Sequence, residues 1–268
     1  MMKGSRVILR SLLAMLVLSL AACVTVVESP FNKKASPEKA VDNYTQLGLG
    51  YMQKGRNDLA RQRLRKALSI NENYAPANDA MGLLWQSEGE LDLAEESFLK
   101  AISLDGDFSL AKHHVGRLYS QLKRYDEAEE YLSVAAQDRY YDNRASAYND
   151  LALSYFRAGQ SEKAITTYRE ALRISPYNVD SLVNISTLLF EAQDYSESGK
   201  YFDRFDRVVK RGQAGYSAHS LWLGIKLATI GQNTKRTIEL ATQLKQLYPE
   251  SQEYKEYQQS LKDAGAGQ

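Results

Sequence analysis

The chain has few of the residues from which catalytic and metal sites are built. Its 268 residues include one cysteine and three histidines. One cysteine cannot form an intramolecular disulfide, and it excludes zinc sites that need several thiolates. The sequence also has no phosphate-binding glycine loop, no nucleophile elbow and no His-Glu-x-x-His pattern. We therefore expect no catalytic residue, metal, cofactor or small-molecule substrate.

Residues that interrupt helices are scarce, and neither sign of charge dominates. There are five prolines and 16 glycines, and 34 basic residues face 33 acidic ones, a formal net charge of +1. A chain that is 44% hydrophobic has the composition of a folded protein. Because there is no strong basic field, nucleic acid is not an expected partner.

The N-terminal 22 residues have the order of an export signal. Three basic residues and no acidic residue precede an apolar run at 11–20. That run is too short to span a bilayer. We predict a signal peptide at 1–22, and its removal takes three positive charges from the formal +1, which leaves −2.

The single cysteine follows this signal at once. Leu20-Ala21-Ala22-Cys23 resembles the lipobox of bacterial lipoproteins, and the resemblance implies that Cys23 is acylated. Val24 stands where an aspartate would retain such a protein at the inner membrane, so the resemblance implies an outer-membrane anchor that faces the periplasm. The alternative is ordinary cleavage after Ala21, which would leave a soluble secreted protein with an unused thiol.

The segment after the cysteine lacks helical periodicity and contains Pro30 and Pro37. We predict a lipidated tether at 23–39. Roughly 15 flexible residues have an end-to-end distance of about 20 Å. Such a tether would let the following domain work some distance from the lipid surface.

A short pattern, an apolar residue followed by glycine and then by an aromatic residue three positions later, recurs along the chain. Three clear copies are 34 residues apart and three weaker ones follow; the six begin at Leu47, Met81, Val115, Leu151, Ile185 and Leu223. Thirty-four residues is the period of tetratricopeptide repeats. We predict an all-α, right-handed superhelical solenoid of six tetratricopeptide-like hairpins at 40–262, and a disordered tail at 263–268.

Four copies place glycine inside the first helix, at Gly48, Gly82, Gly116 and Gly224. Such a glycine costs about 1 kcal/mol relative to alanine, so a compensating close approach of the second helix is expected. The fifth unit is weaker, since Ser186 replaces this glycine and Phe205 stands where alanine is usual.

The first helix of each hairpin should turn one face to the concave side of the solenoid. This predicted groove displays mostly apolar residues: Leu49, Met52, Leu83, Leu153, Phe156, Val183, Phe190, Leu221 and Ile225. Apolar groups on a wet face favour binding of an apolar or amphipathic partner segment. The alternative is that the register errs by one residue and that some of these side chains are core.

Polar residues in the same register give further expectations. Thr45 and Asp79 share the groove with Leu49, where a carboxylate clamp needs basic and amide residues, so binding of a C-terminal carboxylate is disfavoured. His113 is expected on the concave side and His114 nearer the packing layer. We expect neither histidine to bind metal.

Glutamates such as Glu95 and Glu129 are interpreted as solvated helix faces, and the repeat tyrosines as core. Two insertions, at 137–144 and 211–215, are either recognition loops or simple linkers.

Several segments of the chain resemble the PilF/PilW/Tgl lipoproteins of type IV pilus assembly. They are residues 44–51, 64–70, 136–138, 221–227 and 247–254. The resemblance implies a pilotin, which binds pilus secretin subunits, holds to outer-membrane lipid through Cys23, and promotes secretin localisation and oligomerisation. The alternative is a tetratricopeptide envelope scaffold that recruits peptidoglycan hydrolases. Either would be a binding protein and not an enzyme.

Overall fold

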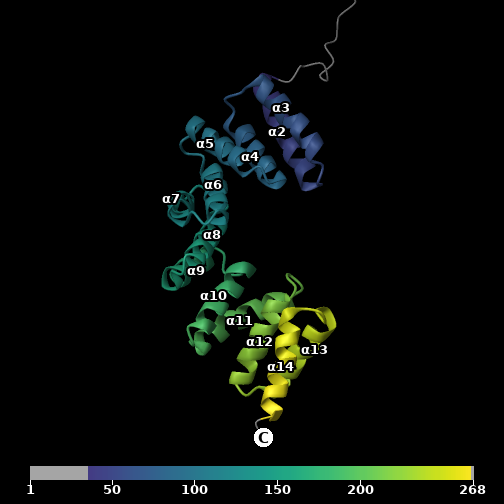
Figure 1. Ribbon diagram of the computed structural model, residues 1–268. Coiled ribbons are helices and arrows are strands. Elements are labelled where there is room, and N and C mark those ends of the chain that lie inside the picture. The colour runs from purple at the N-terminus through teal and green to yellow at the C-terminus, as the bar shows by residue number, and fades with distance from the viewer. Residues whose placement is uncertain (1–35, 267–268) are drawn as a thin grey trace, which may run out of the picture. The chain divides into compact units, whose positions relative to one another are not determined.

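The computed structural model describes residues 36–266, with side chains as far as residue 263. In this range there are thirteen α-helices and no strand (Figure 1). The predicted signal peptide at 1–22 and Cys23 lie outside the described residues. The first described helix begins at Pro37, within the predicted tether, and the last continues to Ala266, within the predicted tail.

Twelve of the helices form six hairpins. These are α2 (Pro37–Gln53) with α3 (Asn57–Ile70), α4 (Ala75–Glu88) with α5 (Leu91–Leu104), α6 (Ser109–Gln121) with α7 (Tyr125–Gln137), α8 (Arg144–Arg157) with α9 (Ser161–Ile174), α10 (Val179–Glu191) with α11 (Tyr195–Lys210), and α12 (Ala218–Ile230) with α13 (Thr234–Leu247). The predicted fold class, an all-α superhelical solenoid of tetratricopeptide hairpins, is confirmed.

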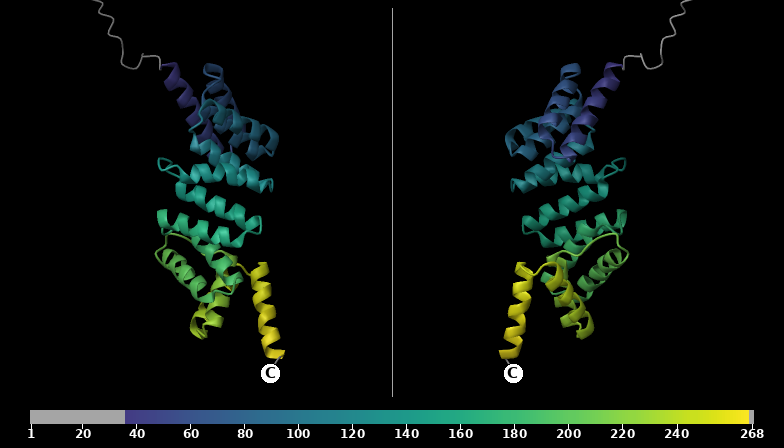
Figure 2. Two further views of the ribbon diagram at one scale, coloured as in Figure 1. Left: turned by 90° about the vertical axis from the view of Figure 1, so that its left-hand side faces the viewer. Right: turned by 90° about the vertical axis from the view of Figure 1, so that its right-hand side faces the viewer.

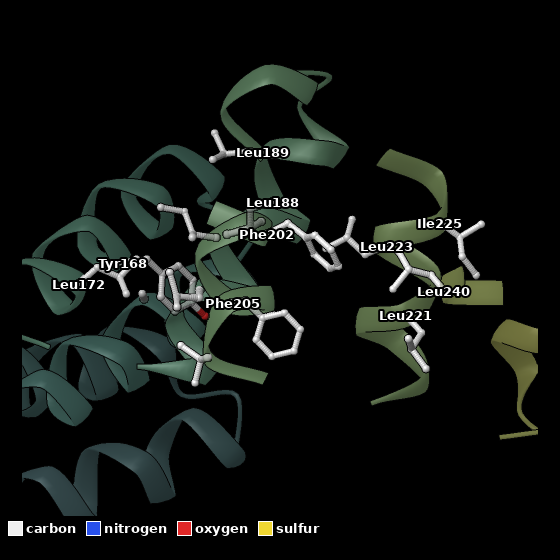
Figure 3. Close-up of a cluster of buried hydrophobic side chains, with 14 of the residues drawn as sticks. Tyr168, Leu172, Leu188, Leu189, Phe202, Phe205, Leu221, Leu223, Ile225 and Leu240 are labelled. Carbon is white, nitrogen blue, oxygen red and sulfur yellow. The ribbon is translucent and has the colours of Figure 1, made fainter. Parts of the chain in front are cut away.

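Residues from Val41 onward belong to one compact unit, in which each hairpin packs on the next. The second helix of one hairpin contacts the first helix of the following hairpin, as α5 with α6 and α7 with α8 (Figure 2). The core is therefore a series of clusters between neighbours. The largest joins α8 to α13, and Figure 3 shows Phe202 pointing from α11 toward Leu223 on α12.

The glycines inside the first helices lie where the second helix approaches most closely. A Cβ placed on Gly82 would be 2.6 Å from the ring of Phe98, and one on Gly116 would be 2.6 Å from Leu132 Cγ. Both distances are shorter than any ordinary van der Waals contact. The close approach predicted from the repeated glycine is confirmed.

The fifth hairpin reaches the same packing with different side chains. Ser186 Oγ donates to the carbonyl of Ser198 at 2.9 Å, and Ser198 Oγ donates to the carbonyl of Ser186 at 2.7 Å. The hydroxyl at the glycine position is thus satisfied across the hairpin. Phe205 packs edge-to-face on Phe202 and Tyr216, with centroids 5.8 and 5.7 Å away, and so fills space that an alanine would leave empty.

Alanine at Gly116 is expected to lower the free energy of unfolding by about 1–3 kcal/mol, because the new methyl group overpacks Leu132. Gly50 is the matched control, since a Cβ there has no neighbour within 4 Å. Gly50→Ala should leave stability unchanged or raise it by up to about 1 kcal/mol. Urea denaturation followed by circular dichroism measures both, and equal effects would contradict the packing argument.

A thirteenth described helix, α14 (Gln252–Ala266), follows the last hairpin and was not predicted as a separate element. It contacts α12 and α13, and Figure 2 shows it standing beside the last hairpin. Trp222 Nε1 donates to Glu256 at 2.9 Å, and the Trp222 and Tyr257 rings meet edge-to-face. This helix therefore covers the end of the last hairpin.

Among the helices of residues 36–266, none is both long and apolar enough to span a bilayer.

Candidate partner-binding groove

The seven residues proposed for the groove keep part of their surface exposed. Phe156 is 37% exposed. The others are half-buried: Leu49, Met52, Leu83, Leu153, Val183 and Phe190. Partial exposure is compatible with a binding face, but nothing in the structure tests whether a partner occupies it. The assignment of these seven residues stays a prediction.

These side chains do not form one continuous cluster. Leu49 and Met52 pack on buried residues of α3 and α4, such as Leu64 and Leu84. Leu83 packs on the next cluster along the chain, which is centred on Phe98. Val183 and Phe190 pack on the large C-terminal cluster. These five groove residues therefore also contribute to the packing between hairpins.

Two further residues of the predicted groove are core. Leu221 is 0% exposed and Ile225 is 2% exposed, so the prediction that they face the groove is wrong. Both belong to the large cluster that joins α8 to α13. In the last hairpin α14 packs on α12 and supplies a neighbour that the repeat pattern did not include.

The polar residues assigned to the groove are also buried. Thr45 is enclosed, and its hydroxyl donates to the carbonyl of Val41 at 2.8 Å. Asp79 is buried beside His114, with 2.8 Å between Oδ1 and Nδ1. The prediction that they line the groove is wrong, because each finds a partner that satisfies it inside the packing layer.

His113 is buried rather than displayed on the concave side. Its Nε2 lies 2.8 Å from Asp150 Oδ2, and its Nδ1 lies 2.9 Å from the hydroxyl of Tyr141. A carboxylate only accepts hydrogen bonds, so Nε2 carries a proton. Burial raises the pKa of Tyr141 to about 12. The Tyr141 hydroxyl is thus neutral, and the hydrogen-bonded chain Tyr141–His113–Asp150 links a loop to α6 and α8.

The insertion at 137–144 is joined to α6 by hydrogen bonds. Tyr141 holds His113, and Asp138 accepts from Ser109 Oγ at 2.5 Å. Tyr140, in contrast, is 96% exposed. The insertion is therefore tied to the solenoid at two points and leaves one tyrosine in solvent.

No group of three or more His, Cys, Asp or Glu in the described residues is arranged to hold a metal ion.

Two glutamates interpreted as solvated are partners of the repeat tyrosines. The hydroxyl of Tyr119 donates to Glu95 at 2.9 Å, and that of Tyr155 donates to Glu129 at 2.7 Å. Burial and these bonds raise the pKa of both tyrosines. Arg124 also donates to Glu95, at 2.8 Å. These side chains fasten the second helix of one hairpin to the first helix of the next.

The second insertion, at 211–215, leads to a buried charged group. Asp206 on α11 is paired with Lys210 at 2.8 Å and with Arg236 of α13, and it accepts from the hydroxyl of Tyr216. The hydroxyl of Tyr248 donates to the carbonyl of Tyr216 at 2.5 Å. Asp206 therefore connects the fifth and sixth hairpins across the insertion.

A small cavity opens beside Leu153, one of the predicted groove residues. It has a volume of about 260 Å³ and is walled by α4, α6 and α8. Arg117 and Arg157 both line it. The sequence offered no signal for this cavity, since its walls come from three different repeats.

Comparison with known proteins places the repeats in a family. Models described as "Tetratricopeptide repeat" match residues 41–74, 75–108, 107–176 and 149–208. The "Type IV pilus assembly protein PilF" of Pseudomonas aeruginosa is 32% identical over 249 residues, which are 92% of this chain and 97% of that protein.

Solved structures agree with this relationship. The structure of Pseudomonas aeruginosa PilF has a TM-score of 0.78 and 32% identity, and covers 84% of this chain and 99% of that one. PilW, described as a widely conserved type IV pilus biogenesis factor, has a TM-score of 0.71 over 81% of this chain and 97% of its own; its 23% identity shows the shared fold. The family resemblance predicted from the sequence is confirmed, and the chain belongs to the PilF family of tetratricopeptide-repeat proteins.

Proposed function

We propose that the chain acts in type IV pilus assembly by binding pilus secretin subunits and promoting their localisation and oligomerisation at the outer membrane. It binds its partner and catalyses no reaction. The observation that carries the proposal is the match to a type IV pilus assembly protein over nearly the full length of both chains. The half-buried apolar side chains on the first helices supply a surface for a protein segment.

The proposed mechanism is capture. A secretin subunit held on a lipid-anchored protein stays near the bilayer, which raises its effective concentration for ring formation. The hairpins are suited to this task because each is packed on its neighbours, which holds its first helix in place. In this mechanism the lipid anchor keeps the protein at the outer membrane, and the groove binds the secretin subunit.

Leu49 and Met52 are the residues to change first. Replacing both with lysine should abolish capture, because each puts a charge where an apolar partner surface would lie. Lysine is preferable to glutamate here, since its aliphatic stem can keep the packing on Leu64 and Leu84 while the charge reaches water. We expect the secretin multimer on a denaturing gel to be lost in cells that lack the gene and in cells that carry the double variant, with secretin monomer still present.

Leu47→Lys is the matched control, because Leu47 lies on the same helix and is already exposed. It should restore the multimer as well as the wild-type gene does. Circular dichroism of the double variant must show a folded protein for the result to count. Unchanged multimers in the double variant would remove the groove assignment. Unchanged multimers in cells without the gene would overturn the proposed function and favour a scaffold for peptidoglycan hydrolases.

A further inference from the structure

We propose that the cavity between α4, α6 and α8 binds a carboxylate side chain of an extended acidic and apolar segment in a partner protein. The inference rests on the proposed function in that the occupant is a protein, and it names the chemistry that the middle of the solenoid recognises. It concerns the second to fourth hairpins, whereas Leu49 and Met52 belong to the first.

The size of the cavity favours a side chain over a cofactor. Small-molecule sites commonly measure about 300–1,000 Å³, and this cavity measures about 260 Å³. Its walls are the first helices of three consecutive hairpins. A peptide lying across these helices would have one side chain directly over the cavity.

The charge of the walls favours an anion. Arg117 and Arg157 contribute two positive charges and Asp150 one negative charge. Asp150 is already engaged on both oxygens: Oδ2 by His113 at 2.8 Å and Oδ1 by the amide of Asn149 at 3.3 Å. Within the described residues Arg157 makes no ion pair. The cavity therefore has a net positive charge that the chain itself does not balance.

Arg117 lies beside Asp150 and keeps 55% of its side chain exposed. Its Nε lies 3.4 Å from Asp150 Oδ2, and the Asp150 carboxylate is in turn fixed by His113. The interaction uses the Nε side of the guanidinium and leaves the two Nη groups for a ligand. Arginine binds carboxylates through pairs of parallel hydrogen bonds.

Neutral polar groups in the walls suit a peptide. The Ser120 hydroxyl is buried and has no hydrogen-bond partner among the described residues; a ligand oxygen would supply one after rotation of the side chain. Gln86 Nε2 donates to Gln121 Oε1 at 3.0 Å. That bond leaves the Gln86 carbonyl and the Gln121 amide protons for a peptide backbone.

Apolar side chains adjoin the charged ones. Leu153 lines the cavity, and Phe156 follows three residues later on α8 and is exposed. Residues three apart lie on the same helical face. A segment in which a glutamate or aspartate is followed by a large apolar residue would satisfy both the arginines and this apolar strip.

The experiment uses the full chain in detergent micelles and two pools of fluorescent nine-residue peptides. One pool has glutamate at the centre with leucine or phenylalanine two positions later, and the other has glutamine in place of the glutamate. Fluorescence anisotropy should show tighter binding of the glutamate pool by at least tenfold. Arg117→Ala with Arg157→Ala should remove this preference.

Arg65→Ala is the matched control, because Arg65 is exposed on α3 and makes no ion pair among the described residues. It should bind the glutamate pool as the wild type does. Equal binding of the two pools, no binding of either, or an equal loss in Arg65→Ala would each overturn the site. The two proposals can fail separately. If the chain binds the glutamate pool selectively but secretin multimers are unaffected in cells without the gene, the cavity proposal stands and the secretin proposal is overturned.

Discussion

Replacing Asp206 with alanine is expected to lower the free energy of unfolding by about 3–5 kcal/mol, the effect of removing one partner of a buried ion pair. Asp206 and Arg236 are both largely enclosed, with side chains 10% and 16% exposed. Without the carboxylate, the guanidinium of Arg236 and the hydroxyl of Tyr216 lose their shared acceptor. Urea denaturation would show the midpoint fall.

Asp203 provides the control for this substitution. It lies on the same helix and is exposed, so Asp203→Ala should change stability by no more than about 0.5 kcal/mol. A similar small effect for Asp206→Ala would mean that the network contributes little and that the fifth and sixth hairpins are held together by apolar packing alone.

The same carboxylate should make stability depend on pH in the acid range. Burial opposes ionisation of Asp206, but hydrogen bonds from Lys210 and Tyr216 and the charge of Arg236 outweigh it, so its pKa lies below the ordinary 3.8. A depressed pKa stabilises the folded state above pH 3.8 and ceases to do so as the pH falls through the folded value. The difference in Tm between wild type and Asp206→Asn should therefore shrink below about pH 3.8.

The repeat period and the glycine positions could be predicted from the sequence because both follow from local geometry. A glycine that recurs at Gly48, Gly82 and Gly116 indicates that the second helix of each hairpin approaches closely at this position. The number of hairpins follows from the same pattern. The helix α14 does not, because it occurs once and matches no repeat.

The polar residues of the groove register were placed wrongly for a different reason. Asp79 and His114 are 35 residues apart, and His113 and Asp150 are 37 apart. Each of these polar residues, taken alone, would be expected to face solvent. Its burial is tolerated only because the fold brings its hydrogen-bond partner beside it. The cavity between α4, α6 and α8 escaped prediction in the same way, since its residues approach one another only when three hairpins are stacked.

The proposed mechanism anchors the protein through acylated Cys23, so removing this thiol should release the protein from the membrane. A buried methylene contributes about 0.8 kcal/mol, and one acyl chain alone binds membrane only marginally and reversibly. The three chains of a mature lipoprotein would make the attachment effectively permanent, so the expected change on losing them is from all of the protein in the membrane fraction to almost none. The helices of the domain pack on one another, so the Tm of the domain should not change.

Two variants test whether the lipid anchor is needed for secretin assembly. In one, Cys23→Ala is combined with replacement of residues 1–22 by an ordinary cleavable export signal, so that the protein reaches the periplasm without lipid. In the other, Val24→Asp should keep the lipid and hold the protein at the inner membrane. Secretin multimers should be lost in the first variant and reduced in the second, because capture then occurs away from the outer membrane. Full multimer formation by the soluble protein would show that recognition by the solenoid suffices and that the anchor is dispensable.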